Sequence, residues 1–310
     1  MFRRIAVIAL NTYREAVRAR ILHGLFGLAL ATLGYALVVA AFALRETLRV
    51  VSDLGAASIS IYSILVAIVL GATSLYRELE LKTIFPILAR PLRRSEYLIG
   101  KYLGTLLTLT VFVAANSGVL LLAVGELSGR ALSVVTATGL GSVLVAGLVA
   151  WRVKRWRTFV PILWAFSVLG LGWFLAAGAR DERQLLVGSG FLVLCEVGIV
   201  IAIATVFAAF SSPFLTALFT TGVLIVGRSA DTLAHLPVRV FGQTIQHMAQ
   251  VLSRIVPNLM LYVPPRPLLT GEAAGQPLGT YLLWAAGHTT AWCVVLLALA
   301  SLIFKRRDFL

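Results

Sequence analysis

The feature of this sequence that most limits its fold is a series of apolar runs, each long enough to cross a membrane or nearly so. A helix needs about 20 mostly apolar residues to cross the hydrocarbon core of a bilayer. Of the 310 residues, 59% are hydrophobic and 13% are charged, whereas charged residues make up about a quarter of a soluble domain. We therefore expect an all-α integral membrane protein, with no large soluble catalytic domain on this chain.

Eight of these runs are expected to span the membrane, and charged or proline-containing turns separate them. The chain is thus expected to form one transmembrane domain, 1–310, built on a helical bundle of about eight spans. The run at 214–227 is the shortest. The predicted spans are 22–44, 54–75, 96–123, 131–150, 158–178, 185–210, 214–227 and 281–304.

The N-terminal stretch 1–21 has the pattern of an amphipathic helix rather than a span. Arg4, Asn11, Glu15 and Arg18 recur on one face at helical spacing, and mostly apolar residues lie opposite. Such a helix lies in the plane of the membrane interface with its cations toward the lipid headgroups. We therefore take Arg4, Arg14 and Arg18 as candidate interfacial anchors.

The long segment 228–280 has no run that is apolar and long enough to cross the membrane. It does contain an apolar stripe at helical spacing, which predicts a second interfacial helix in a segment on the outer side. That segment is open to two interpretations, a cap over the transport path or a contact for a periplasmic or extracellular partner. The stripe consists of Phe241, Ile245, Met248, Leu252 and Ile255.

The distribution of cations predicts how the chain is oriented. With the N-terminus inside, 18 of the 27 Lys and Arg residues fall in segments on the inner side, as expected for short cytoplasmic loops. Both termini are therefore predicted to be cytoplasmic in a multi-pass protein. The net charge of +14 is explained by this asymmetry and by anionic headgroups, so no nucleic-acid partner is expected.

The sequence lacks the patterns of ATP binding, metal binding and nucleophilic catalysis. Its only Gly-Lys pair, Gly100-Lys101, is followed by Tyr102 and has no glycine five residues before it, so it is not a phosphate-binding loop. The four histidines are scattered, and none belongs to a metal-ligating motif. No cofactor, metal site or catalytic residue is therefore expected on this chain.

Glu196 is the one carboxylate near the middle of a predicted span. Intramembrane charges are costly and often mark a transport pathway. Two interpretations remain open: Glu196 lines the translocation path, or it is a protonated or paired structural residue facing the bundle. Asn116 is a second candidate path residue, and with Ser117 and His288 it is a candidate neighbour of Glu196.

The charged segment 76–95, between the second and third predicted spans, is too long for a minimal turn. Glu78, Glu80 and Lys82 offer a charged surface to a soluble partner, although a solvated loop would have a similar composition. Residues 77–104 also resemble the stretch that type-2 ABC exporter permeases carry after their second span: a charged run, a Thr-Ile pair, an Arg-Pro pair and Gly-Lys-x-x-Gly. Further blocks match in the family's order at 11–18, 210–214, 227–229, 256–259 and 304–309.

This resemblance implies the membrane-spanning permease subunit of an ATP-driven ABC exporter, non-catalytic itself and coupled to a separate cytoplasmic ABC ATPase. Two ATPase copies would bind ATP and magnesium, and a second permease copy or a paralogue would complete a dimer in the inner (cytoplasmic) membrane of a prokaryote. Segment 76–95 would be the cytoplasmic coupling helix. Its candidate coupling residues are Glu78, Glu80, Lys82, Thr83, Arg90 and Arg93.

The family plan has six spans, so the resemblance marks 130–180 as an extra two-helix insertion of unknown purpose, with lipid anchoring and a partner contact both open. The transported substrate is not given by the sequence. Two other classes stay as alternatives: an ion-driven secondary transporter and a membrane scaffold without an ATPase partner. A secondary transporter would need several intramembrane carboxylates and an internal repeat, and neither is found.

Overall fold

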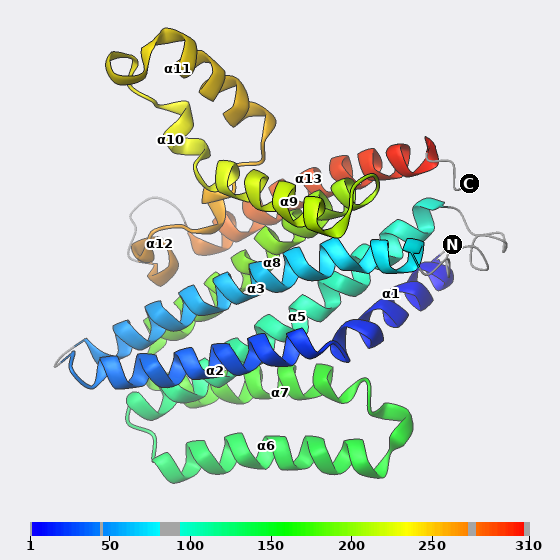
Figure 1. The fold of residues 1–310 in the computed structure, drawn as a ribbon. Coiled ribbons are helices and arrows are strands. Elements are labelled where there is room, and N and C mark those ends of the chain that lie inside the picture. The colour runs from blue at the N-terminus through cyan, green and yellow to red at the C-terminus, as the bar shows by residue number, and fades with distance from the viewer. Residues whose placement is uncertain (1, 44–45, 81–93, 272–276, 307–310) are drawn as a thin grey trace.

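The computed structural model describes residues 2–43, 46–80, 94–271 and 277–306, apart from the side chains of 75–80, 238–241 and 306. Every regular element in these ranges is a helix, which confirms an all-α membrane protein (Figure 1). Seven described helices are long and apolar enough to span a membrane. They are α2 (Arg20–Ala40), α3 (Thr47–Glu80), α5 (Arg94–Leu127), α6 (Leu132–Arg152), α7 (Val160–Leu175, with η2, Ala176–Gly178), α8 (Arg180–Ala208) and α13 (Leu278–Arg306).

The seventh predicted span, 214–227, coincides with α9 (Pro213–Arg228), an apolar helix of 16 residues. At 1.5 Å per residue it is about 24 Å long, shorter than the roughly 30 Å of a bilayer core. Pro213 occupies its first turn and Ser212 is its N-cap residue, a favourable pairing because proline lacks the N–H that a helix start leaves unpaired. The helix α9 therefore reaches only part of the way through the bundle.

Several helices extend beyond their apolar runs. The helix α3 begins at Thr47 rather than at 54, so the predicted polar loop before it was wrong. Arg49 lies 3.9 Å from Glu46 and 3.8 Å from Asp53, which are ion-pair spacings of a solvated helical turn. The helix α8 likewise starts at Arg180 with two acidic residues in its first turn, where they complement the positive end of the helix dipole.

The helices α5 and α8 form the centre of the bundle, since 78% of the residues in the most apolar 18-residue stretch of each helix are buried. Around them lie α3, α7, α13 and α1 (Phe2–Val17). The first and last described residues lie at the same end of the bundle (Figure 1), which we call the terminal face. This agrees with an even number of crossings. The other end is the opposite face.

The N-terminal helix α1 packs tightly against α5 because two glycines of α5 leave room for it. A Cβ atom at Gly104 would lie 2.4 Å from the carbonyl oxygen of Ala9 and 2.6 Å from Cβ of Thr12. At Gly100 it would lie 2.7 Å from Cβ of Ile8. Gly100 and Gly104 therefore serve close helix packing.

The segment 130–180 forms a helical hairpin of α6 and α7, joined by a basic turn that contains η1 (Lys154–Trp156). The helix α7 packs closely on α5, where a Cβ atom at Gly172 would lie 2.8 Å from the carbonyl oxygen of Gly118. In contrast, only 6% of the residues in the most apolar 18-residue stretch of α6 are buried. The hairpin is therefore attached to the bundle through α7, with α6 at its outer edge (Figure 1).

The segment 228–280 contains α10 (Ala230–Ala234), α11 (Val238–Ile255), η3 (Met260–Tyr262) and α12 (Arg266–Thr270). The helix α11 extends away from the bundle (Figure 1) and is kinked at Gly242, whose φ of 78° favours glycine. The predicted apolar stripe is exposed wherever it is described, except at Phe241, whose side chain lies outside the described set. Those exposed residues are Ile245, Met248, Leu252 and Ile255, as expected for an interfacial helix.

Candidate functional site

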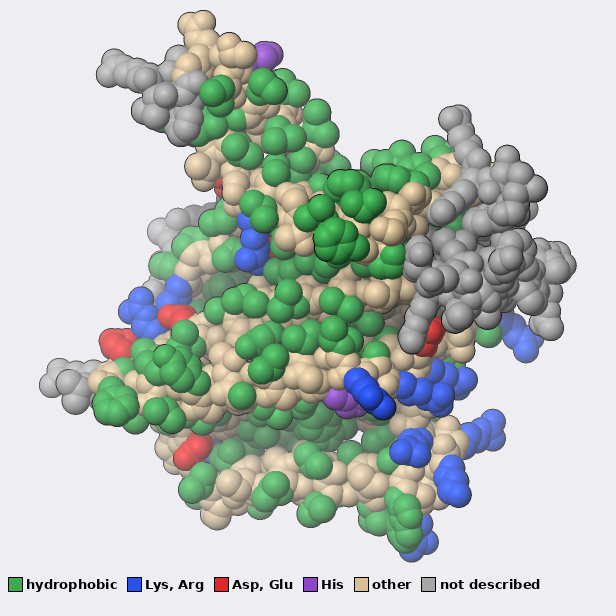
Figure 2. All heavy atoms as spheres, viewed as in Figure 1, with side chains coloured by type: hydrophobic (Ala, Val, Ile, Leu, Met, Phe, Trp, Pro, Cys, Tyr) green, Lys and Arg blue, Asp and Glu red, His purple; other side chains and the backbone are tan. Residues whose placement is uncertain are grey.

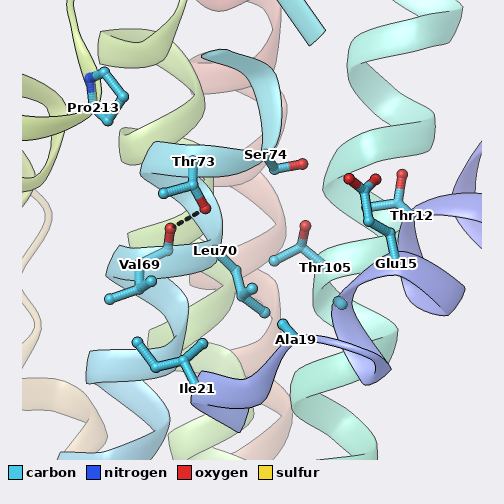
Figure 3. A pocket seen from close by; sticks show the side chains of 11 residues that line it. Thr12, Glu15, Ala19, Ile21, Val69, Leu70, Thr73, Ser74, Thr105 and Pro213 are labelled. Carbon is cyan, nitrogen blue, oxygen red and sulfur yellow. Dashed lines mark hydrogen bonds between the residues drawn. The ribbon is translucent and has the colours of Figure 1, made fainter. Parts of the chain in front are cut away.

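A cavity of about 400 Å³ lies in the half of the bundle nearer the terminal face (Figure 3). It forms where α1 ends and α2 begins, since Ala19 between them has an extended backbone. The helices α3 and α5 form its other walls, and Pro213 at the start of α9 closes one side. We call this space the junction cavity.

The walls of the junction cavity combine apolar side chains with a few polar atoms. Val69, Leu70 and Ile21 supply apolar surface. The hydroxyl of Thr73 donates to the carbonyl of Val69 over 2.7 Å, and that of Thr105 donates to the carbonyl of Lys101 over 3.1 Å. Because these hydroxyl protons are used within the helices, the oxygens face the cavity mainly as hydrogen-bond acceptors.

A cation and an anion lie beside the junction cavity. The buried Lys101 of α5 donates to the backbone carbonyl oxygen of Ser74 over 2.6 Å and to its hydroxyl over 3.3 Å. Glu15 of α1 is exposed, and its carboxylate lies across from Ser74 and Thr105 (Figure 3). The ammonium of Lys101 therefore ties α5 to α3, the two helices that flank the segment 81–93.

Glu196 is fully buried and paired. Its two carboxylate oxygens accept from Nε and Nη2 of Arg228, at 2.8 and 2.9 Å, and Nη2 also donates to Ser60 over 3.0 Å. Of the two interpretations of Glu196, this geometry matches the paired structural residue. The pair joins the end of α9 to the middle of α8 and to α3.

Asn116 is not among the hydrogen-bond partners that the structure shows for the Glu196 carboxylate, which binds Arg228. The Asn116 amide donates to the carbonyl of Phe112, four residues earlier in α5, over 2.8 Å. The void beside Asn116 measures about 10 Å³, close to the smallest space that holds one water. Asn116 thus donates within its own helix and borders this small void.

His288 also has partners other than Glu196. Since the indole of Trp292 can only donate, its 3.1 Å bond makes Nε2 of His288 an acceptor. A neutral ring then carries its proton on Nδ1 and donates to Tyr262 over 2.9 Å, and Tyr262 donates to Thr289 over 2.7 Å. This chain of hydrogen bonds joins η3 to α13, so His288 serves interhelical packing. The sequence reasoning missed Tyr262.

At the opposite face, Arg266 of α12 bridges two acidic side chains that are far apart in the sequence. Its guanidinium forms ion pairs with Asp53 of α3 and Glu182 of α8. The sequence reasoning assigned no role to Arg266. Like the Arg228 pair, this bridge links the segment 228–280 to the two helices α3 and α8.

The candidate coupling residues are only partly described. Lys82, Thr83, Arg90 and Arg93 lie outside the described residues, and for Glu78 and Glu80 only the backbone, in the last turn of α3, is described. The segment's downstream boundary is anchored: Arg94 donates to the carbonyls of Phe304 and Lys305 over 3.0 and 3.1 Å. The start of α5 thus caps the C-terminal end of α13.

The candidate interfacial anchors are all exposed, Arg4 and Arg14 on α1 and Arg18 in the turn directly after it. The guanidinium of Arg14 lies 5.7 Å from the centre of the Phe159 ring, within cation–π range. Arg14 therefore also connects α1 to the turn of the α6–α7 hairpin.

These features define a multi-pass helical membrane protein with a partly open cavity between its helices, and its described residues hold no cluster of three His, Cys, Asp or Glu for a metal ion. The chain belongs to the ABC-2 transporter family, because the family model described as ABC-2 family transporter protein matches residues 6–309. Permeases of this family lie in the membrane and work with ABC ATPase partners. No curated protein matches the chain.

Proposed function

We propose that this chain is the permease subunit of an ATP-driven exporter and that the junction cavity is part of its translocation path. The observation that carries the proposal is the position of the cavity. It lies between α3 and α5, the helices that enter and leave the segment 81–93, within a chain that matches the ABC-2 family over nearly its whole length.

The terminal face is assigned to the cytoplasm of a prokaryotic cell. Lys and Arg side chains gather at this end over the start of α2 and the α6–α7 turn (Figure 2), in keeping with the cytoplasmic excess of cations in membrane proteins. Both termini, the N-terminal helix and the segment 76–95 then face the same compartment as a soluble ATPase.

Coupling would pass through the segment 76–95, with Glu78, Glu80, Lys82, Thr83, Arg90 and Arg93 as the contact residues. A displacement of this segment moves α3 and α5 together, because the Lys101 ammonium holds the two helices at Ser74. It also moves α13, whose last carbonyls accept from Arg94. The helices α3, α5 and α13 would thereby move together when the segment 76–95 is displaced at the terminal face.

The full transporter would contain two ATPase copies, which bind ATP and magnesium, and a second permease copy or paralogue. Support for a second permease comes from α9, whose outer surface includes Phe214, Leu218 and Ile225 at 77%, 55% and 61% exposure. Because Pro213 at the start of the same helix lines the junction cavity, a partner on α9 would help to close the path. The transported substrate stays open.

The test is to express the chain with the ABC ATPase encoded beside it and to purify the complex through a tag on this chain alone. The Glu78→Lys/Glu80→Lys variant is expected to release the ATPase or to abolish vanadate-sensitive ATP hydrolysis. Glu46→Lys, at the opposite face and 64% exposed at its side chain, is the matched control and should retain both.

Absence of a co-purifying ATPase, with the permease folded, would reject the proposal. An ion-driven transporter and a membrane scaffold without an ATPase partner would then remain. For the ion-driven transporter, substrate movement should follow an imposed proton gradient in vesicles and should be lost in a folded Glu196→Gln variant, whereas a scaffold should move no substrate.

A further inference from the structure

A second cavity, of about 550 Å³, lies between α6 and the helices α2, α5 and α7. Figure 2 shows the surface hollowed between α2 and α6. Within the membrane-spanning depth its walls are apolar. They include Phe26, Phe112, Ala115, Val143, Gly147 and Trp164. We call this space the hairpin groove.

The hairpin groove exists because α6 is held away from the bundle. A Cβ atom at Gly147 or Gly141 of α6 would meet no atom within 4 Å, whereas one at Gly118 of α5 would lie 2.6 Å from the backbone of α7. The indole of Trp164 donates to the hydroxyl of Ser142 over 3.2 Å and spans the two hairpin helices. The small residues of α6 thus border space that a bilayer must fill with lipid chains.

Within the membrane-spanning depth of the hairpin groove, the hydroxyl of Thr108 already forms a hydrogen bond. Thr108 donates its hydroxyl to the carbonyl of Gly104 over 2.9 Å. A peptide strand or a sugar would leave its own polar groups unpaired against these walls, which is costly in an apolar environment. An acyl chain has no such groups, so its chemistry fits the depth of the groove.

The mouth of the hairpin groove at the terminal face is cationic. Arg157 and His23 line it. Residues 131–179 contain four basic side chains, all within 152–157, and no Asp or Glu. All four are exposed: Arg152, Lys154, Arg155 and Arg157. Trp151 directly precedes the cluster and Trp156 lies within it, and both are exposed, as is typical of residues at headgroup level.

We propose that the hairpin groove binds an anionic glycerophospholipid, with an acyl chain between α6 and α5 and the headgroup phosphate at Arg157. The guanidinium suits a phosphate because it offers several N–H donors in a planar fork. The basic cluster selects an anionic headgroup over a zwitterionic one. The two-helix insertion therefore serves to hold a specific lipid against the bundle.

The bound lipid would touch the wall of the junction cavity. Val17, Leu22 and His23 line the hairpin groove, and Ala19 and Ile21, between them in the chain, line the junction cavity. The α1–α2 junction thus separates the two spaces. A lipid in the groove braces this junction from the side away from the proposed path.

Native mass spectrometry of the purified permease–ATPase complex tests the site. The probes are phosphatidylglycerol and phosphatidylethanolamine with identical acyl chains, added to delipidated complex. Wild type is expected to retain phosphatidylglycerol preferentially. The Arg157→Gln variant is expected to bind phosphatidylglycerol about fivefold more weakly, because that is the effect of one cation near a membrane surface. Arg130→Gln, an exposed cation before α6 at the other end of the hairpin, controls for net charge.

A second pair of variants tests the groove independently of charge. Gly147→Leu fills the hairpin groove and should reduce retention of both lipids, whereas Gly141→Leu on the same helix fills a different groove, between α6 and α7, and should not. Thermal melting of each complex verifies that it is folded. Equal retention of the two lipids by wild type, unchanged retention in Arg157→Gln and Gly147→Leu, or a polypeptide in place of lipid would overturn the proposal.

Discussion

Arg228 at the end of α9 binds both carboxylate oxygens of Glu196 in the middle of α8, and the same guanidinium reaches Ser60 of α3. A bidentate pair of this kind is specific in geometry as well as in charge. It fixes the point at which the short helix α9 stops. The segment 228–280, which follows α9, therefore starts from a defined position within the bundle.

Breaking this pair is expected to destabilise the protein strongly. Arg228→Gln leaves the fully buried Glu196 carboxylate without its partner, and loss of one member of a buried pair costs about 3–5 kcal/mol. Glu196→Gln should cost less, because the Arg228 side chain is 33% exposed. The exchanged pair Glu196→Arg/Arg228→Glu should recover part of the loss. Thermal unfolding of the purified complex in detergent measures both effects. Single variants that melt like wild type would contradict a structural role for the pair.

The close packing of α1 against α5 gives a second prediction. Gly104→Val places side-chain atoms where Ala9 and Thr12 now lie, at 2.4 and 2.6 Å from the added Cβ, and overpacking of this kind costs about 1–3 kcal/mol. The melting temperature should fall, and α1 should become accessible to protease. Gly24→Ala is the control, since its Cβ would meet no atom within 4 Å and alanine favours the helix.

The order of the long helices, and their number apart from the short helix α9, could be predicted from the sequence, because a bilayer demands runs of a set length and charged turns interrupt them. Helix ends were predicted less well. The runs at 54–75 and 185–210 mark the apolar part of α3 and α8, while Thr47 and Arg180 begin helices that continue into polar sequence. Hydropathy reports contact with lipid, whereas helix length also depends on ion pairs and caps outside it.

The partner of Glu196 was the main feature of the site that sequence reasoning missed. Arg228 lies 32 residues away on another helix, and the count of cations placed it in an outer segment. A signal was present, since a lone buried acid and a basic residue at the end of an apolar run are each costly unless paired. Their pairing still required the position of α9, which no local pattern encodes.

The Lys101 contact predicts that coupling to ATP hydrolysis can be weakened while the complex still folds and assembles. Lys101→Met removes the ammonium that binds the Ser74 carbonyl over 2.6 Å while keeping an apolar stem of similar length. We expect an assembled complex whose ATP hydrolysis responds less to the permease, by about tenfold if the contact transmits about 1.4 kcal/mol. Ser74→Ala deletes only the 3.3 Å bond to the hydroxyl and should behave nearly as wild type. Unchanged coupling in Lys101→Met would remove this residue from the transmission route.

The buried phenol of Tyr13 in α1 predicts a loss of stability in alkali. Its side chain is fully buried, and among the described residues its hydroxyl has no hydrogen-bond partner. Burial raises the pKa of Tyr13 from 10.0 to about 12. The folded state therefore holds a proton that the unfolded state releases, so this group's stabilising effect is complete below pH 10 and is lost as the pH rises toward 12.

Tyr13→Phe should remove that part of the alkaline loss and should also spare the cost of an unpaired buried hydroxyl, about 1–3 kcal/mol. Melting curves of wild type and Tyr13→Phe between pH 9 and 11 are expected to diverge as the pH rises, with the variant the more stable. Because other buried tyrosines are common to both proteins, their contribution cancels in the difference. Curves that stay parallel across this range would show that Tyr13 ionises as readily in the folded protein as in the unfolded chain, and would place its hydroxyl in contact with water.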